Sequence, residues 1–251
     1  MSSKATGLAA RRLAALVIGL GIWEALVRLR LVNPFYIPAP SKVAETLVTL
    51  FADGEIWTHI EATFSAALLG LALGVVVGAA LGTAAALFPR LGEILDPAMT
   101  VLNAVPRIIL APLFVIWFGI GIASKVAVTF VLIAVLFFFA IYSGIKEVDQ
   151  RLIDRVRTLG GGRAVLLREV YLPAVTAWGL SHLKIAVGFA FTGAVVGEFV
   201  ASSRGLGYLL SFAQSTYNAA LTLALLLVVI VFVFVLFSLA AALEKRLLRW
   251  R

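Results

Sequence analysis

The sequence predicts an all-α membrane protein that crosses the bilayer six times and keeps both termini in the cytoplasm. Of its 251 residues, 62% are hydrophobic and only 14% are charged, and the mean hydropathy is +1.07. A soluble domain is about half apolar, and a single core of this length cannot bury so much apolar surface. Several uncharged runs also reach the roughly 20 residues that a helix needs to cross the hydrocarbon. Lipid is therefore the expected solvent.

Six segments fit a membrane-spanning helix. They are 11–27, 62–88, 101–124, 126–145, 178–200 and 219–243. The second, fourth and sixth segments carry no charge, and the fifth keeps its charges near its two ends. The third contains Pro106 and Arg107, so a single helix interrupted at the proline is expected there. The first contains Glu24 but is followed by no small-residue cleavage site, so we expect it to stay in the mature protein as a helix.

The positions of lysine and arginine predict how these helices are oriented. With the N-terminus inside, 14 of the 21 basic residues fall on the cytoplasmic side, five fall outside and two lie within spans. Cytoplasmic loops carry this excess of positive charge. The chain then divides into an N-terminal end with the first helix, 1–30, an extracytoplasmic segment, 31–61, and a five-helix core, 62–251. The core includes a long cytoplasmic loop, 146–177.

The absence of certain residues and motifs from the sequence excludes several functions. It has no cysteine and only two histidines, so disulfides, cysteine-ligated zinc and thiol catalysis are excluded and no metal site is expected. No Gly-Lys pair occurs, so the usual phosphate-binding loop for ATP is absent. The net charge of +8 lies beside apolar spans, which indicates orientation in the membrane and not nucleic-acid binding. We therefore predict no catalytic residue and no cofactor.

The loop at 146–177 is the most informative segment. Its central part, IDRVRTLGGGRAVLLREVYLP, predicts a short helix, a glycine turn, a second helix and a stop at Pro173. Glycine permits the positive φ that such a turn needs. We expect the loop to present a short helix to a partner protein. An amphipathic linker lying on anionic head groups is the alternative.

These residues resemble the membrane-spanning subunits of binding-protein-dependent ABC importers, which share the cytoplasmic pattern E-A-A-x-x-x-G-x9-I-x-L-P. The spacing is intact here, and the matching positions include Asp154, Arg155, Val156, Gly160, Leu172 and Pro173. Arg155 and Val156 stand where the family has small residues. The stretches NPFYIPAPSKV, NAVPRIILAPLFVIWFGIG and GEFVASSRGLGYLL resemble the nitrate, sulfonate and taurine branch of the family. The resemblance thus covers nearly the whole chain from Asn33 onward.

The resemblance implies the type I ABC importer permease fold in a bacterial cytoplasmic (inner) membrane. The implied partners are a second permease copy, two cytoplasmic ATPase subunits and an extracytoplasmic solute-binding protein. Leu159, Gly160 and Arg163 are then central to the contact with the ATPase. The implied solute is a small anion such as nitrate, bicarbonate, taurine or an alkanesulfonate, while other members handle pyrimidine or aromatic compounds. The other class of protein left open is an ion-coupled secondary transporter, and ATP dependence separates the two.

Four glycines recur every four residues along the second segment. They are Gly70, Gly74, Gly78 and Gly82, and they form three overlapping G-x-x-x-G units. Small residues let membrane helices approach closely. We therefore expect this stripe to contact a neighbouring span or a second subunit, with pore lining as the alternative.

The third segment is a candidate for lining the translocation pathway. Pro106 and Pro112 free backbone groups there, which a membrane tolerates where those groups meet protein or water. Arg107 lies beside the first proline. A packing kink without a transport role is the alternative.

The outer end of the fifth segment is a candidate gate. Glu198 precedes Gly205 and Gly207, and its partner has to come from another span, a loop or water. A carboxylate does not suit direct binding of an anion, because like charges repel. We therefore expect Glu198 to act in gating and not in solute contact.

Overall fold

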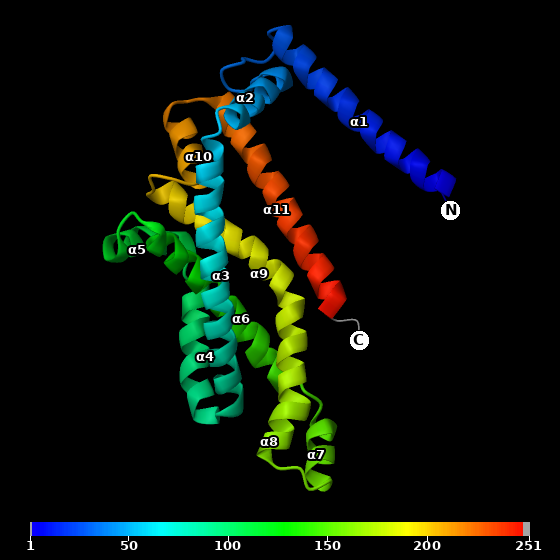
Figure 1. The fold of residues 1–251 in the computed structure, drawn as a ribbon, viewed down its shortest axis with the longest axis vertical. Coiled ribbons are helices and arrows are strands. Elements are labelled where there is room, and N and C mark those ends of the chain that lie inside the picture. The colour runs from blue at the N-terminus through cyan, green and yellow to red at the C-terminus, as the bar shows by residue number, and fades with distance from the viewer. Residues whose placement is uncertain (1, 248–251) are drawn as a thin grey trace. The chain divides into compact units, whose positions relative to one another are not determined.

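The computed structural model describes residues 2–247, and every regular element among them is helical. Four stretches are long and apolar enough to cross a membrane: Ile56–Leu87, Ile122–Lys146, Arg163–Val200 and Ala219–Ala242. The prediction of an all-α, multi-pass membrane protein is confirmed (Figure 1). The count of six spans and the side of the termini stay predictions. Contacts divide the described chain into two units, residues 58–208 with 230–247 and residues 2–57 with 209–229.

The core of the larger unit is built around α6 (Ile122–Lys146), which lies between α3 (Ile56–Leu87) and α9 (Leu172–Val200). Buried side chains of α6, among them Phe137, meet alanines of both neighbours, such as Ala66 of α3 and Ala190 of α9. Small residues on the two flanking helices let their backbones approach α6 closely. The core is therefore a three-helix packing in which the central helix supplies most of the large buried side chains and α9 adds Phe191.

The four glycines of α3 all lie against α6. A methyl group at Gly74 would come within 2.5 Å of Ile133 Cβ, and one at Gly82 within 2.6 Å of the Phe138 carbonyl oxygen. Gly70 and Gly78 leave equally little room. In this structure the stripe contacts a neighbouring span of the same chain.

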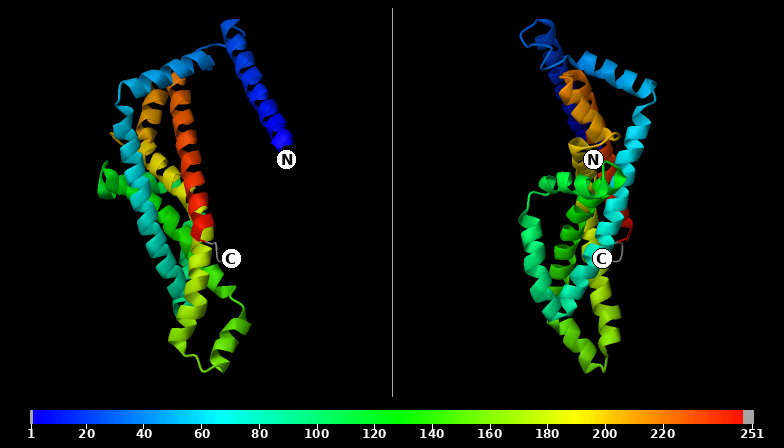
Figure 2. Two further views of the ribbon diagram at one scale, coloured as in Figure 1. Left: turned by 45° about the vertical axis from the view of Figure 1, so that its right-hand side comes forward. Right: turned by 90° about the vertical axis from the view of Figure 1, so that its left-hand side faces the viewer.

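Two helices and a short turn replace the single helix that the sequence predicts over 101–124. They are α4 (Pro89–Ala104), a 3-10 turn (Arg107–Ile109) and α5 (Leu110–Phe118). α4 runs back beside α3, whereas α5 lies across the direction of α4 and α6 (Figure 2). The prediction of one interrupted helix is therefore wrong.

Proline and glycine explain these breaks. Val105 is extended, with ψ 127°, because a residue that precedes proline is driven out of the helical region. Pro106 has no N–H to continue the helix. Gly119 ends α5 at a φ of +76°, and α6 begins only three residues later.

The cytoplasmic loop of the prediction forms a helical hairpin that leads directly into α9. It consists of α7 (Gln150–Thr158), α8 (Arg163–Leu166) and a π turn (Leu167–Tyr171). The predicted stop at Pro173 is wrong, since helix runs without interruption from Arg163 to Val200. Because proline has no N–H, the carbonyl four residues earlier in the helix loses its usual hydrogen-bond donor. The wider π turn, in which the Leu172 N–H bonds to the Leu167 carbonyl, lies directly before that proline.

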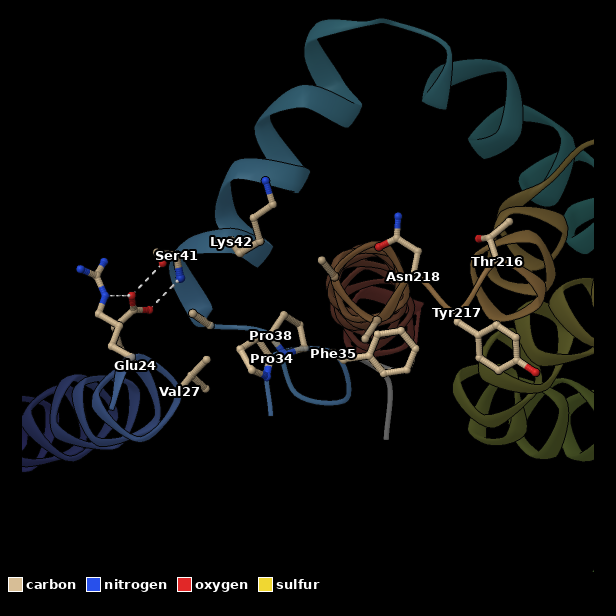
Figure 3. Close-up of a pocket in the computed structure, with 14 residues that line it drawn as sticks. Glu24, Val27, Pro34, Phe35, Pro38, Ser41, Lys42, Thr216, Tyr217 and Asn218 are labelled. Carbon is tan, nitrogen blue, oxygen red and sulfur yellow. Dashed lines mark hydrogen bonds and ion pairs between the residues drawn. The ribbon is translucent and has the colours of Figure 1, made fainter. Parts of the chain in front are cut away.

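The smaller unit contains α1 (Ser2–Arg28) and α2 (Pro40–Ala52). Glu24 of α1 joins them, because its carboxylate accepts the backbone N–H of Ser41 at 3.0 Å and the hydroxyl of Ser41 at 2.7 Å (Figure 3). Arg28 donates to the same carboxylate at 2.7 Å. Ala39, the residue that precedes α2, has no side-chain cap to offer. Glu24 therefore caps α2 from another helix.

A hollow of about 660 Å³ lies beside this contact in the smaller unit. Phe35 and Tyr217 line it together with Glu24 and Arg28 (Figure 3). The remaining helices of the chain are α10 (Leu206–Ser215) and α11 (Ala219–Leu247).

Candidate functional site

The glycine turn between α7 and α8 has the geometry that the sequence predicts. Gly160 has a φ of +81°, and its N–H bonds to the carbonyl of Arg157 at 2.9 Å. The next N–H, of Gly161, bonds to the carbonyl of Val156 at 2.9 Å. Together these two bonds form a Schellman C-cap, in which the residue at positive φ is usually glycine. At the other end of α7, the Asp149 side chain accepts the N–H of Arg151 at 2.9 Å and caps the helix.

The hairpin has a small apolar core of its own. Ile153 of α7 is buried against Leu166 and Val170, and Val156 packs on this cluster. Val156 also lies so close to Gly161 that a methyl group there would come within 2.6 Å of Val156 Cγ1. The valine at a position that is small in the family is thus an internal residue that helps hold the turn.

Most of the predicted coupling residues lie on the outside of this hairpin. Asp154, Arg155, Leu159, Gly160, Arg163 and Leu172 are exposed, whereas Val156 and Pro173 are partly buried. α7 and α8 lie beyond the ends of α6 and α9, at the tip of this unit (Figure 1). The hairpin therefore offers an exposed surface away from the helices that form the core.

Glu198 is the centre of a second, buried group at the other end of α9. Its side chain is 2% exposed. One carboxylate oxygen accepts both the hydroxyl of Thr63 at 2.8 Å and the N–H of Gly207 at 2.9 Å. The predicted need for a partner from another span or a loop is met by α3 and by the start of α10.

Three consecutive backbone N–H groups at the start of α10 bind to side chains of α3 and α9. The N–H of Gly205 donates to His59 Nδ1 at 3.0 Å, and that of Leu206 to the Thr63 hydroxyl at 2.9 Å. The N–H of Gly207 completes the series with its bond to Glu198. The first N–H groups of a helix have no partner within the helix, so this arrangement satisfies them inside the protein.

Both glycines of this group are required by the geometry. Gly205 has a φ of +118°, and a methyl group there would overlap the Glu198 carboxylate. A methyl group at Gly207 would overlap the Val195 carbonyl and come within 2.8 Å of Glu198 Cβ. The structure thus brings together Glu198, Gly205 and Gly207, three of the residues that the sequence indicates as gate candidates.

Three members of this region are not predicted from the sequence. His59 and Thr63 lie on α3, far from Glu198 in the chain, and the ring of His59 stacks on Tyr208 at 5.8 Å. Lys125, at the start of α6, is only 3% exposed and donates to the carbonyls of Ile120 and Gly121. Lys125 lies between the third and fourth predicted segments, so the sequence alone gives no signal that it is buried.

Glu198 and Lys125 line the same cavity of about 210 Å³, together with Ser202, Ser203 and Arg204. Ile120, Gly121 and Ile122, at the end of the third predicted segment, line it too, whereas Pro106 and Pro112 do not. Pro106 lies in the break between α4 and α5, and Pro112 is the third residue of α5. Arg107 begins the 3-10 turn, and its side chain lies outside the described residues.

Comparison with known proteins identifies the family. The model of the family described as "Binding-protein-dependent transport system inner membrane component" matches residues 70–249. The chain belongs to this family. It is therefore an ABC importer permease, a multi-pass protein of the inner membrane whose ATPase resides in a separate subunit. Membership of the family decides against the secondary-transporter alternative.

Three relatives illustrate how far the likeness extends. The taurine transport system permease protein TauC of Escherichia coli (strain K12) is 32% identical over 240 residues, which cover 94% of this chain and 87% of TauC. The putative aliphatic sulfonates transport permease protein SsuC of Bacillus subtilis (strain 168) is 31% identical, with coverage of 92% and 84%. The riboflavin transport system permease protein RibX of Chloroflexus aurantiacus is 33% identical, with coverage of 94% and 88%.

A solved structure has the same fold. It is a crystal structure of an amino acid ABC transporter, and the match has a TM-score of 0.66 and 18% identity. The match covers 80% of this chain and 97% of that one. At this level of identity the likeness extends to the fold alone.

Proposed function

We propose that this chain forms the translocation pathway of a type I ABC importer for a small sulfonate or another small anion. Two copies of the chain form the pathway, two cytoplasmic ATPase subunits drive it and an extracytoplasmic binding protein delivers the solute. The observation that carries the proposal is the hairpin of α7 and α8, with Gly160 at positive φ and an exposed outer surface. A pathway needs no such hairpin unless a partner binds to it.

α9 is the element that transmits movement in this proposal. The helical stretch Arg163–Val200 has 38 residues, which corresponds to about 55 Å. It begins at the coupling hairpin and reaches Glu198 near its other end. When the ATPase subunits close on ATP, the displaced hairpin moves this helix, and the contacts of Glu198 with α3 and α10 move with it.

The group around Glu198 acts as an outer gate in this proposal. Its carboxylate is already bound to Thr63 and to the backbone of Gly207, and its negative charge opposes an anionic solute. Because these bonds hold the start of α10 to α3 and α9, α10 is held in place while they last. Pro106, Arg107 and Pro112, at the break between α4 and α5, stay candidates for lining the pathway.

Six crossings remain the topology that we infer, with α4 as the third. α1, α3, α4, α6, α9 and α11 then cross the membrane, and both termini are cytoplasmic. α4 has 16 residues, about 24 Å, and the extended residue and the turn behind it add to that length. α5, which packs on α6 through Ala111 and Phe114, then lies at the outer side, across the crossing helices.

A taurine or alkanesulfonate solute is favoured by the names of two relatives, and nitrate and bicarbonate belong to the same class of small anions. A larger aromatic solute is the second candidate, because the riboflavin permease is as similar to this chain as the taurine permease is. In either case the binding protein selects the solute, since the permease offers only transient contacts. Transport into proteoliposomes, with taurine and riboflavin compared in the presence of the receptor, separates the two.

Co-purification with the candidate ATPase tests the proposal as a whole. Gly160→Val forces a β-branched residue to a φ of +81°, so we expect the permease to lose the ATPase. Gly162→Ala is the matched control, because Gly162 has a φ of −81° and no atom lies within 4 Å of its Cβ position. Retention of the ATPase by Gly160→Val at the wild-type level, with both variants folded, would contradict the coupling role.

A further inference from the structure

The outer surface of α7 combines two arginines with exposed leucines. Arg151 and Arg155 are both exposed and stand one helical turn apart, so their side chains leave the helix on the same side. Leu159 follows Arg155 by another turn and is 79% exposed, and Leu152 is 51% exposed. We call these four residues the basic face of α7.

The basic face is not used within the hairpin. The opposite side of α7 supplies Ile153 and Val156 to the apolar core. Two other arginines of the hairpin have partners, since Arg157 lies 3.8 Å from Asp154 and Arg168 lies 3.6 Å from Glu169, whereas no ion pair is formed by Arg163 of α8 within the described residues. Within the described residues, Arg151 and Arg155 form no such pair.

Position 155 is one of the positions where this chain departs from the cytoplasmic pattern of its family. The shared pattern has a small residue there, whereas this chain has arginine. A surface that receives a small residue leaves no space for a guanidinium and no partner for its charge. A partner that closes over α7 must therefore supply both, because a charge buried without a counter-charge is strongly unfavourable.

From this geometry we propose that the basic face of α7 docks in a groove of the ATPase subunit whose carboxylates pair with Arg151 and Arg155, and that this pairing selects the cognate ATPase. The groove has an apolar floor that receives Leu159. The inference rests on the proposed function, since it names the chemistry of the partner that the coupling hairpin binds. It predicts an acidic groove, whereas the family pattern alone predicts only a close approach.

Anionic lipid is the other partner that arginines and leucines suit. The position of α7 favours a protein partner over anionic lipid. The hairpin projects beyond the ends of α6 and α9, and α7 forms part of its tip (Figure 1). An arginine fork also pairs with a carboxylate through two hydrogen bonds, which gives the orientation that a mechanical contact needs.

Titration of purified ATPase against the permease in nanodiscs tests the inference. The variant is the double reversal Arg151→Glu/Arg155→Glu, and Arg168→Glu is the matched control from the same hairpin. The double reversal should weaken ATPase binding at least about tenfold at low salt, and the loss should shrink as salt screens the charges. Arg168→Glu should stay within about twofold of wild type, because an exposed and locally paired charge contributes little.

Two further measurements make the result specific. A second reversal, of an acidic residue in the ATPase groove to lysine, should restore binding of the double variant and weaken binding of wild type. The titration is repeated in phosphatidylcholine and in phosphatidylglycerol nanodiscs. If the loss appears only with the anionic lipid, the basic face binds head groups and the inference is wrong.

The test also separates this inference from the proposed function. If the double reversal binds the ATPase like wild type while Gly160→Val does not bind, the hairpin is the coupling element but its charges do not select the partner. If Gly160→Val also binds like wild type, the coupling role itself is wrong. Circular dichroism of each variant checks that the helices have formed.

Discussion

The turn at Gly160 and the loop at Gly205–Gly207 both depend on glycine, but for different physical reasons. At Gly160 no atom lies within 4 Å of the Cβ position, so only the positive φ demands glycine. At Gly205 and Gly207 a methyl group would overlap the Glu198 carboxylate and the Val195 carbonyl, which adds a lack of space to the positive φ of Gly205. The first region is therefore open on its outer side, whereas the second is a closed and buried junction. Substitutions should change partner binding in the first and stability in the second.

The largest loss of stability is expected from Gly207→Ala. The added methyl group would overlap a backbone carbonyl and lie within 3.0 Å of the Phe199 nitrogen, and backbone does not yield as a flexible side chain does. Overpacking of this kind costs about 3 kcal/mol. Thermal unfolding of the purified permease in detergent measures it. Gly121→Ala, where the Cβ position is open, serves as the control, and equal melting temperatures for the two variants would contradict the prediction.

Thr63→Val should have an intermediate effect. The valine has nearly the same shape, but it neither accepts the N–H of Leu206 nor donates to Glu198. Leaving these buried groups without a partner costs about 2 kcal/mol. Thr63→Ser keeps the hydroxyl and should lose less than half as much. Similar unfolding temperatures for the serine and valine variants would mean that the hydroxyl does not hold α10.

Leu159→Ser should have the smallest effect on stability, below about 0.5 kcal/mol, because the side chain is largely exposed. The substitution should instead weaken ATPase binding, because serine lacks the apolar side chain that docking would bury. Unfolding temperature and ATPase affinity are measured on the same preparation. A variant with unchanged affinity for the ATPase would show that Leu159 does not enter the contact. Substitutions in the open region would then not change partner binding, which is the property that is expected to distinguish it from the buried junction.

The coupling turn could be predicted from the sequence because its signals are local. A Schellman turn needs one residue at positive φ, and the spacing around Gly160 identifies it. The group at Glu198 was predicted only in part. Gly205 and Gly207 follow Glu198 closely, whereas Thr63 is 135 residues away from it. A single sequence holds no signal for a contact over that distance.

The predictions for α4 and for Pro173 are wrong because amino-acid composition and residue type indicate helix boundaries that differ from those in the structure. The sequence does not predict α4, because Arg90, Glu93 and Asp96 interrupt it, whereas the largely apolar residues 101–124, which begin within its last turn, predict one helix. At Pro173 the opposite error occurred. A proline usually ends a helix, but here it stands in the first turn after a π turn, where the helix continues.

The π turn at Leu167–Tyr171 sets the rotational phase between the hairpin and α9. Each residue of an α-helix adds 100° of rotation about its axis, and a π turn contains about one residue more than a regular turn. The π turn, together with the glycine turn that joins α7 to α8, therefore sets the side on which α7 presents its arginines relative to α9. Two permeases with the same docking helix but a different number of residues in this turn would present that helix to different sides.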